Sequence, residues 1–253
     1  MLKVAVVGAK GRMGQTVCQA VENATDLELV AALDQGDQIN AETLAGADVA
    51  VEFTVPSQTR ANVEAILAAG THVVVGTTGW DEDGLNQVRQ QCHTSGKHAI
   101  IAANYALSAV LAMEFAAMAA RWFESVEIIE AHHPNKVDAP SGTAIATAAK
   151  IAAAREQAQC PPLPDATETD EEGCRGGKYH QVPIHAVRLR GLTAQETILL
   201  GNPGETLTIC TDTTDREAFM PGVLLAVREV GARPGLTVGL EQVLDLDRAG
   251  GLT

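Results

Sequence analysis

The sequence predicts an α/β protein with an N-terminal Rossmann-type doubly wound parallel sheet and a second α+β domain with a mostly antiparallel or mixed sheet. Three observations predict it. Short strand-like runs alternate with helical patterns over the first hundred residues, and a glycine-rich loop follows the first run. Beyond residue 180, strand-like runs instead follow one another with only turns between them.

Five apolar, mostly β-branched runs predict the strands of the first sheet. They are Leu2–Val7, Leu27–Leu33, Asp48–Phe53, His72–Val75 and His98–Ala102. Helical patterns separate them at Arg12–Glu22, Gln58–Ala69 and Glu82–Cys92. This alternation is typical of βαβ units, so we expect the strands to be parallel.

The second half of the chain has a different pattern. We expect an amphipathic helix over Ser108–Trp122, a strand at Val126–Glu130, an alanine-rich helix at Thr143–Arg155, and a loop rich in Pro and Gly over Cys160–His180. Strands are expected at Pro183–Arg190, Glu196–Leu200 and Glu205–Thr211, with a hairpin turn at Asn202-Pro203-Gly204.

A final helix, expected over Asp215–Val230, has no obvious place in that second sheet and could return to the first domain. The predicted domains are therefore residues 1–105 together with about 216–253, and residues 106–215. No internal repeat is visible.

Composition narrows the class of protein. The net charge of −14 disfavours nucleic acid and anionic membranes as partners, so an anionic substrate would need a local basic island. The five cysteines are scattered and form no CxxC pair, which is typical of free thiols in a reducing compartment, here the cytoplasm. The first residues read as a strand rather than a signal peptide, and no apolar run reaches the ~18 residues of a membrane span.

The first candidate site is the loop Gly8-Ala9-Lys10-Gly11-Arg12-Met13-Gly14, between a strand and a helix. Such glycines let the backbone approach a pyrophosphate at a helix N-terminus. Asp34 ends the second strand, where an acid usually binds a ribose hydroxyl. Asp34 favours NADH, whereas Lys10 and Arg12 could offset its repulsion of a 2′-phosphate, so NADH or NADPH stays open. The alternative is an ordinary βα turn.

Two later strand ends carry small polar residues. They are Gly76-Thr77-Thr78-Gly79 and Ala102-Ala103-Asn104-Tyr105. In a doubly wound sheet, ligands bind at the carboxyl ends of the strands, so both segments are predicted to line the nicotinamide. Each could equally be a simple turn.

The second candidate site runs from Glu130 through His132, His133 and Lys136 to Thr143. Ser141-Gly142-Thr143 opens a helix whose first amides could bind a carboxylate. Histidine and lysine could hold a second carboxylate or move protons, so the segment predicts a site for a small dianion that also needs an acid. Alternatives are a zinc site, which lacks further ligands at the usual spacing, structural histidines, and a plain helix cap.

The stretch from Glu130 to Ala144 resembles the signature of the 4-hydroxy-tetrahydrodipicolinate reductase (dihydrodipicolinate reductase) family of diaminopimelate and lysine biosynthesis. The resemblance extends along nearly the whole chain. It includes Gly8–Gly14, Phe53-Thr54, Gly76–Gly79, Asn104-Tyr105, Pro183–Arg188 and Pro221–Val223. One departure is Ala103, which stands where proline is common in the family and leaves the shape of the loop before Asn104 open.

The resemblance implies a role for each matching position. It implies that His132 is the proton donor, that Lys136 is a second acid contacting substrate, and that His133, Gly142 and Thr143 bind substrate. It implies a dinucleotide site formed by Gly8 to Met13, Asp34, Gly76 to Thr78, and Ala102 to Tyr105. It also implies a homotetramer assembled through the sheet of domain 106–215, which would carry substrate binding and oligomerisation.

The implied reaction is an NADH- or NADPH-dependent reduction, with loss of water, of a cyclic imine that bears two carboxylates. Two other classes compete. A non-catalytic dinucleotide sensor would keep Gly8–Gly14 but has no use for His132 to Thr143. The second competing class is a different reductase or an acylating aldehyde dehydrogenase. An acylating aldehyde dehydrogenase needs a cysteine at a strand–helix junction. Cys18, Cys92, Cys160 and Cys174 do not fit one.

Overall fold

The protein is described by a computed structural model that covers residues 1–244 and 246. Residues 245 and 247–253, the last part of the segment expected to rejoin the first domain, lie outside the described residues. The chain forms two compact units. Unit 1 comprises Met1–Ala106 and the described residues from Arg216 onward, and unit 2 comprises Leu107–Asp215.

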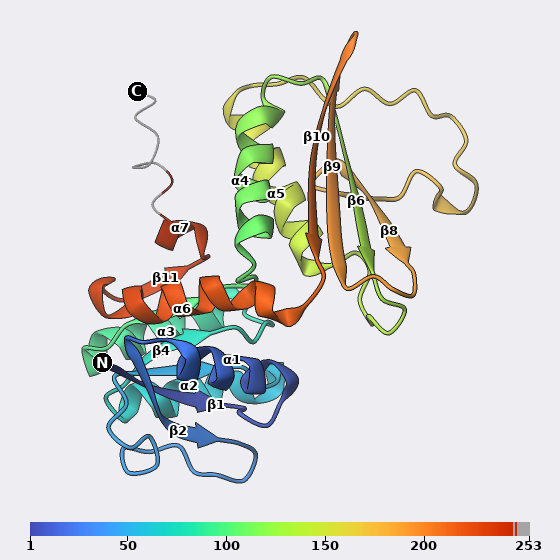
Figure 1. Cartoon of the computed structure of the whole chain (residues 1–253). Coiled ribbons are helices and arrows are strands. Elements are labelled where there is room, and N and C mark those ends of the chain that lie inside the picture. The colour runs from blue at the N-terminus through green and yellow to red at the C-terminus, as the bar shows by residue number, and fades with distance from the viewer. Residues whose placement is uncertain (245, 247–253) are drawn as a thin grey trace. The chain divides into compact units, whose positions relative to one another are not determined.

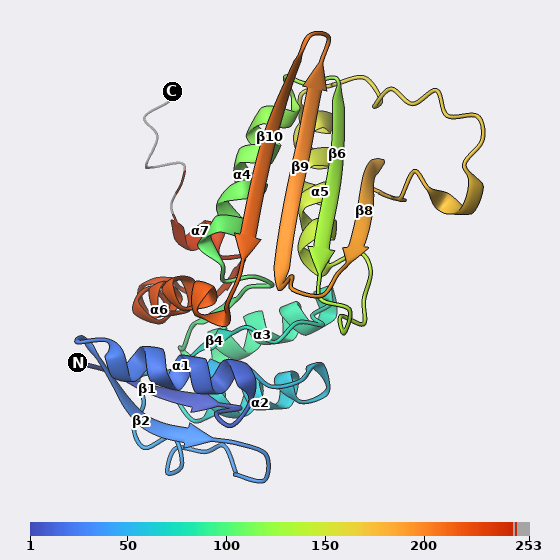
Figure 2. The same cartoon turned by 45° about the vertical axis from the view of Figure 1, so that its right-hand side comes forward.

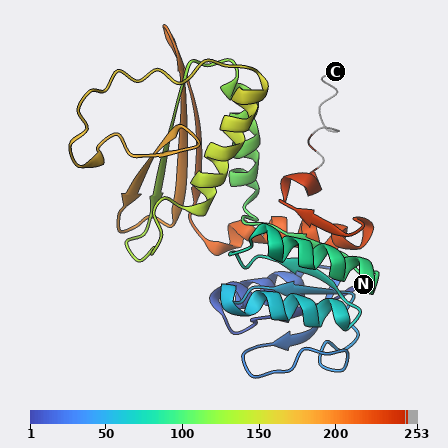
Figure 3. The same ribbon diagram turned by 180° about the vertical axis from the view of Figure 1, so that it is seen from behind.

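Unit 1 contains a sheet of six parallel strands, which confirms the predicted fold class. Its strands, in the spatial order β11-β5-β4-β3-β1-β2, are Leu236–Val238, Ala99–Ile101, His72–Val75, Val49–Glu52, Leu2–Val7 and Leu27–Leu33. Its longer helices are α1 (Arg12–Asn23), α2 (Pro56–Ala68), α3 (Glu82–Ser95) and α6 (Met220–Glu229), with the short α7 (Glu241–Leu244) after them. Figure 3 shows α2 and α3 on the near face of the sheet and α6 behind it.

The order of these strands fixes where a ligand can bind. The chain runs from β1 outward to β2 on one side and then crosses to β3 on the other side of β1. In such sheets a crevice opens at the carboxyl ends of the strands, at the point where the order reverses. The glycine loop leaves β1 at that point. Val4, Ala5 and Val6 of β1 are fully buried, so the strand that carries the loop is held on both faces.

Two features of unit 1 differ from the sequence-based expectation. The strand β11 was not predicted, because three residues are too few for a periodic pattern, yet it pairs with β5 at the sheet edge. The helix expected over Asp215–Val230 is interrupted. It begins as a 3-10 turn at Arg216–Phe219, and the α-helix α6 starts only at Met220, next to Pro221 in its first turn.

Unit 2 contains a mixed five-stranded sheet. Its strands, in the order β10-β9-β6-β8-β7, are Glu205–Thr213, Ala194–Asn202, Ser125–His132, Val182–Arg188 and Gly177–Tyr179. Only β6 and β8 pair in parallel, because the chain crosses between them through α5 (Gly142–Gln157). The helices α4 (Leu107–Ala120) and α5 cover one face of this sheet (Figures 1 and 2).

The side chains of unit 2 correct two expectations. The outer face of α4 is not polar, since Phe115 and Met118 are 51% and 61% exposed, so the expected amphipathic pattern over Ser108–Trp122 is wrong. The loop expected over Cys160–His180 contains the short strand β7, which pairs with β8. Among the described residues, no helix combines the length and the apolar character that crossing a membrane requires.

Candidate functional site

The glycine loop between β1 and α1 is shaped by close backbone contacts. Gly8 has a φ of +87°, and a Cβ there would lie 2.2 Å from the carbonyl oxygen of Phe53. A Cβ on Gly14 would lie 2.0 Å from the carbonyl oxygen of Gly8. A side chain at Gly8 would therefore force the loop away from the end of β3, and a side chain at Gly14 would force α1 away from the loop, so sterics require glycine at these two positions.

The same loop leaves the start of α1 open. The N-cap residue is Gly11, and no side chain caps the helix. The first amides of a helix have no partner within the helix, and they carry its positive dipole end. A cavity of 570 Å³ adjoins this loop, lined in part by Gly8, Gly11, Leu33 and Asp34. An uncapped helix start beside a cavity is a fit for the phosphates of a dinucleotide.

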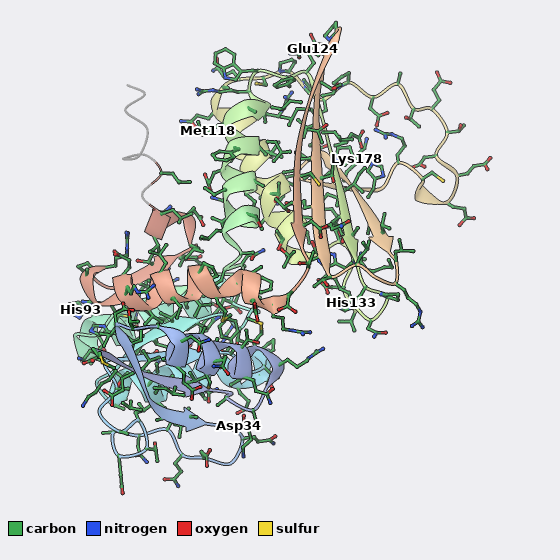
Figure 4. The ribbon with its side chains drawn as sticks, viewed as in Figure 1. Asp34, His93, Met118, Glu124, His133 and Lys178 are labelled. Carbon is green, nitrogen blue, oxygen red and sulfur yellow. The ribbon has the colours of Figure 1, made fainter. Side chains whose placement is uncertain are left out.

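Asp34 ties the end of β2 to the glycine loop. One carboxylate oxygen accepts a hydrogen bond from the Lys10 amide at 2.5 Å, and the other accepts from the Gln35 amide at 2.7 Å. These N–H donors, Gln35 first and Lys10 second, lower the pKa of Asp34, so the carboxyl is ionised. Asp34 is labelled in Figure 4. The predicted acid therefore lies beside the predicted loop.

A second cavity of 340 Å³ brings two predicted segments together. Its lining residues include Gly11, Arg12 and Met13 of the loop and Gly76, Thr77 and Thr78 after β4. The Thr54 amide donates to Oγ1 of Thr77 at 2.8 Å, which joins the loops after β3 and β4. Arg216 also lines this cavity. Arg216 was not among the predicted site residues, because nothing in its local sequence pattern shows that the 3-10 turn returns to this sheet.

A buried carboxylate supports this edge of the sheet. Glu52, the last residue of β3, is fully buried and accepts hydrogen bonds from Thr54, from Thr59 at 2.8 Å and from Asn62 at 3.1 Å. Glu52 was not among the predicted site residues, although a lone charged residue at the end of an apolar strand is a usable signal.

The segment from Ala102 to Tyr105 follows β5 at the same edge. The Tyr105 ring is 2% exposed, its hydroxyl donates to the Val75 carbonyl at 2.8 Å, and its edge meets the Phe53 ring with centroids 5.9 Å apart. The Tyr105 side chain therefore supports the fold from inside. Ala102 is buried, Ala103 is exposed, and Asn104 accepts from the Ala106 amide at 2.8 Å. Only Ala103 and the partly exposed Asn104 present side chains to solvent.

The second candidate site is built around Glu130 at the end of β6. Glu130 is fully buried, yet four donors reach its carboxylate. Arg188 donates from both terminal nitrogens at 2.8 and 2.9 Å, the Ser141 amide donates at 3.1 Å, and Nδ1 of His132 lies 2.6 Å away. Burial by itself would raise the pKa of Glu130, but the bonds from Arg188 and His132 outweigh it and the pKa is lowered. Glu130 is therefore a carboxylate.

This carboxylate determines how His132 is protonated. An ionised carboxylate only accepts hydrogen bonds, so Nδ1 of His132 must carry a hydrogen, and Nε2 is the nitrogen left to exchange a proton. Burial lowers the pKa of His132, and the bond to Glu130 opposes this without cancelling it. The ring is 14% exposed. His132 is thus a fixed, partly buried imidazole that is a stronger acid than usual when charged.

The loop after β6 is held by Arg188 and contains Lys136. Besides its bonds to Glu130, Arg188 donates to the Asp138 carbonyl at 2.8 Å. Nζ of Lys136 lies 2.8 and 2.9 Å from the two carboxylate oxygens of Asp138, and Lys136 holds the pKa of Asp138 below its usual value. Lys136 is therefore positioned to bind a carboxylate, and in this structure it binds the carboxylate of Asp138.

The start of α5 completes the site. Ser141 is the N-cap and accepts from the Ala144 amide at 3.2 Å, while Gly142 and Thr143 are the first two helical residues. Ser141 is thus both a helix cap and, through its amide, a donor to Glu130. His133 lies exposed in the loop after β6 (Figure 4). Unit 2 therefore brings His132, Lys136 and the α5 start together around Glu130.

Two residues of this site were not predicted as functional candidates. Glu130 was seen only as the start of the motif, and Arg188 only as part of a similar stretch. Arg188 lies 58 positions beyond Glu130, so only the pairing of β6 with β8 brings them together. Within residues 1–244 and 246, no three His, Cys, Asp or Glu side chains form a group that could hold a metal ion.

Comparison with known proteins gives consistent matches along the chain. Residues 2–105 match the family model described as dihydrodipicolinate reductase, N-terminus, and residues 108–244 match the one described as dihydrodipicolinate reductase, C-terminus. A 4-hydroxy-tetrahydrodipicolinate reductase from Beutenbergia cavernae is 60% identical over 247 residues, which cover 97% of this chain and 99% of the relative. The protein of that name from Bifidobacterium longum is 55% identical over 252 residues, covering 97% of this chain and the whole relative.

A solved structure agrees. The dipicolinate-bound dihydrodipicolinate reductase from Paenisporosarcina sp. TG-14 is similar with a TM-score of 0.85 and 37% sequence identity. The match covers 96% of this chain and 99% of that one. Because the match extends over nearly the whole chain, both units have the fold seen in that dihydrodipicolinate reductase.

Proposed function

The chain belongs to the dihydrodipicolinate reductase family, and we propose that His132 is the proton donor with which it reduces 4-hydroxy-tetrahydrodipicolinate to tetrahydrodipicolinate. It is an oxidoreductase of diaminopimelate and lysine biosynthesis. The observation that carries the assignment of His132 is its contact with Glu130, since a buried carboxylate that accepts from Nδ1 leaves Nε2 as the nitrogen that exchanges a proton.

The proposed cofactor is NADH or NADPH, held by unit 1. The residues that would hold it are Gly8, Ala9, Lys10, Gly11, Arg12, Met13, Asp34, Gly76, Thr77, Thr78, Ala102, Ala103, Asn104 and Tyr105. The bound nicotinamide would supply the hydride. The uncapped start of α1 supports this assignment, because its amides suit a pyrophosphate. Asp34 favours a free ribose hydroxyl, whereas the exposed Lys10 and Arg12 can offset a 2′-phosphate.

The proposed substrate is a small dicarboxylate held by His133, Lys136, Gly142 and Thr143 of unit 2. The positive end of the α5 dipole and the amides of its first turn suit one carboxylate. Lys136 also suits a carboxylate, because its ammonium nitrogen already lies 2.8 Å from a carboxylate oxygen of Asp138. Substrate would then replace Asp138 or share Lys136 with it.

His132 would act in the second half of the reaction. The ring hydroxyl of the substrate would leave as water before or together with the addition of hydride, and the ring carbon that gains the electron pair would then need a proton. The charged imidazole gives up its Nε2 proton and becomes neutral, while its Nδ1 hydrogen stays on Glu130. A positioned general acid of this kind contributes ~10²–10⁴-fold in rate. Lys136 would stabilise the negative charge and hold the carboxylate through the step.

We further propose that the protein is a homotetramer of the cytoplasm, assembled through the sheet of unit 2. The sheet face away from α4 and α5 supports an assembly surface, because Val187 and Leu199 are 40% and 37% exposed there. The five cysteines are free thiols, as a reducing compartment maintains them. Size-exclusion chromatography followed by light scattering measures the mass of the protein in solution, and the mass of a monomer would contradict the tetramer.

One assay tests the proposed function. Pyruvate and aspartate semialdehyde are mixed with the upstream synthase, this protein is added, and the loss of reduced-nicotinamide absorbance is followed with NADH and with NADPH separately. We expect oxidation of at least one cofactor that depends on all three components. Absence of oxidation with both would overturn the proposal.

A further inference from the structure

Glu196 is a buried acid that the proposed mechanism does not use. It lies on β9 directly opposite Glu130 of β6 in the antiparallel register, and it is 5% exposed. Side chains of directly opposite residues lie on the same face of a sheet, so two carboxyl groups meet in the covered side of unit 2. Such a pair is costly if both are ionised, because like charges repel strongly where water is excluded.

The hydrogen bonds show which of the two is charged. Glu130 has four donors, as described above, whereas Oε1 of Glu196 has no hydrogen-bond partner among the described residues. The other oxygen, Oε2, lies 3.1 Å from the hydroxyl of Thr147. A buried carboxylate oxygen that has no hydrogen-bond donor costs far more free energy than a buried oxygen of a neutral carboxyl group that has none. The arrangement suits an ionised Glu130 and a neutral Glu196.

The hydroxyl of Thr147 points to the same state. It lies 3.0 Å from the carbonyl oxygen of Thr143 as well as 3.1 Å from Glu196. A hydroxyl has one hydrogen to donate, and the carbonyl can only accept. If Thr147 donates to Thr143, the hydrogen between Thr147 and Glu196 must come from Glu196. A protonated Glu196 thus satisfies both contacts at once.

We propose that Glu196 holds a proton in the folded protein and that, on releasing it, Glu196 adds a second negative charge beside Glu130, so that the proton affinity of His132 depends on the charge of Glu196. His132 is two residues beyond Glu130, which makes it a diagonal neighbour of Glu196 across the two strands. Charges at that separation of roughly 7–8 Å change each other's proton affinity by about one pH unit in a partly buried setting. Glu196 is therefore a positioning residue that acts electrostatically through its neighbours.

Other charged groups near Glu196 do not remove this coupling. On β6 they are Glu130 and His132, and Arg188 of β8 is bound to Glu130. On α5 and α4 the nearest charged residues are Lys150 and Glu114, which form an ion pair and largely offset each other. On β10, Thr211 faces Glu196 and carries no charge, while Asp212 is on the opposite face. Lys136 in the following loop lowers the pKa of His132.

The direction of the titration agrees with the geometry. Burial raises the pKa of Glu196 to about 7, the Thr147 hydroxyl opposes this, and the charge of Glu130 adds to it. The group therefore changes charge in the pH range in which a histidine acts as an acid. When a dianionic substrate raises the pKa of His132 into the same range, the two groups would titrate as a coupled pair.

The proposal is tested first without substrate or cofactor, by NMR on protein labelled in glutamate carboxyl carbons and histidine rings. We expect the carboxyl resonance of Glu196 to titrate near pH 7, and the ring resonance of His132 to inflect with the same midpoint. Glu196→Gln should remove that inflection. The control Glu127→Gln should retain it, since Glu127 is on the same strand as Glu130 and His132 but binds Arg175 and His185 on the other face of the sheet. A Glu196 resonance that titrates in the ordinary acidic range overturns the proposal, even if the variant fails to fold.

The second test rests on the proposed function and uses the pH dependence of kcat. An ionised Glu196 keeps His132 charged to higher pH. We therefore expect Glu196→Gln to move the alkaline limb of the kcat–pH profile to lower pH by about half to one unit. The limb should not move in Glu127→Gln. An unchanged limb in Glu196→Gln overturns the proposal. A wild type without reductase activity would instead contradict the proposed function and leave the NMR result standing.

Discussion

The carboxylate of Glu130 lies 2.6 Å from Nδ1 of His132 at the end of one strand, and Arg188 of the neighbouring strand holds that carboxylate with both terminal nitrogens. The ring of His132 is thereby fixed in one tautomer and one orientation. Because Glu130 also accepts from the Ser141 amide, the same carboxylate joins the acid to the start of α5. A single buried side chain thus organises the proposed acid and the proposed carboxylate site.

Replacing His132 should remove the proton donor. We expect His132→Ala to lower kcat by ~10²–10⁴-fold with little change in cofactor affinity, because the ring touches substrate and not the dinucleotide in this mechanism. Steady-state kinetics together with cofactor titration by fluorescence measure both quantities. A near-normal kcat would exclude His132 as the acid.

The contact between Glu130 and His132 can be tested by a double-mutant cycle. Glutamine at position 130 can donate to Nδ1 as well as accept, so the fixed tautomer is lost, and we expect Glu130→Gln to lower kcat by about tenfold to a hundredfold. In a His132→Ala background the same change should have less than about a threefold effect, because the partner is absent. Equal effects in both backgrounds would show that Glu130 acts on stability alone.

Lys136 should contribute to binding as well as to chemistry. We expect Lys136→Ala to raise KM for the dicarboxylate and to lower kcat, with a loss in kcat/KM of about tenfold to a hundredfold, the value of a charged hydrogen bond. Asp138→Asn is the matched change, since it removes the carboxylate that Lys136 now binds, and KM should then stay the same or fall. An effect of Lys136→Ala confined to cofactor binding would place Lys136 elsewhere in the mechanism.

Asp34 should govern the choice between the two cofactors. The Asp34→Asn variant keeps an oxygen for the amide of Lys10 or Gln35 but removes the negative charge that a 2′-phosphate would meet. We expect the ratio of kcat/KM for NADPH to that for NADH to rise by about tenfold, which corresponds to one exposed charge–charge repulsion. An unchanged ratio would mean that Asp34 does not face the ribose.

The buried carboxyl of Glu196 should make stability depend on pH. Its pKa is raised by burial from 4.5 to about 7, so the folded state binds this proton more tightly than the unfolded chain does. The resulting stabilisation is fully present below pH 4.5 and is lost as the pH rises through about 7; it amounts to about 3 kcal/mol in total. Urea unfolding of wild type and Glu196→Gln from pH 5 to pH 8 measures it.

The comparison isolates this one group. All other ionisable side chains are common to the two proteins, so their contributions cancel in the difference between the free energies of unfolding. We expect that difference to shift in favour of Glu196→Gln as the pH rises. A difference that does not vary with pH would show that Glu196 is ionised throughout.

The sequence determined the architecture and the identity of the candidate residues. Alternating apolar runs predict the parallel sheet because buried strands must be apolar, and Gly8 and Gly14 are required by contacts under 2.5 Å that any Cβ would make. The motif around His132 was visible because its polar residues are consecutive. Short-range patterns are set by local sterics and by burial, both of which the sequence records directly.

Only the tertiary structure decided the state of the acid. Arg188 and Glu196 are far from Glu130 in sequence and reach it through the pairing of β6 with β8 and with β9. The register of those strands depends on the whole sheet, and it decides that one carboxyl receives four donors while the one opposite has an oxygen without any. A charge state is set by everything around the group, and it is therefore not written in any local stretch of the sequence.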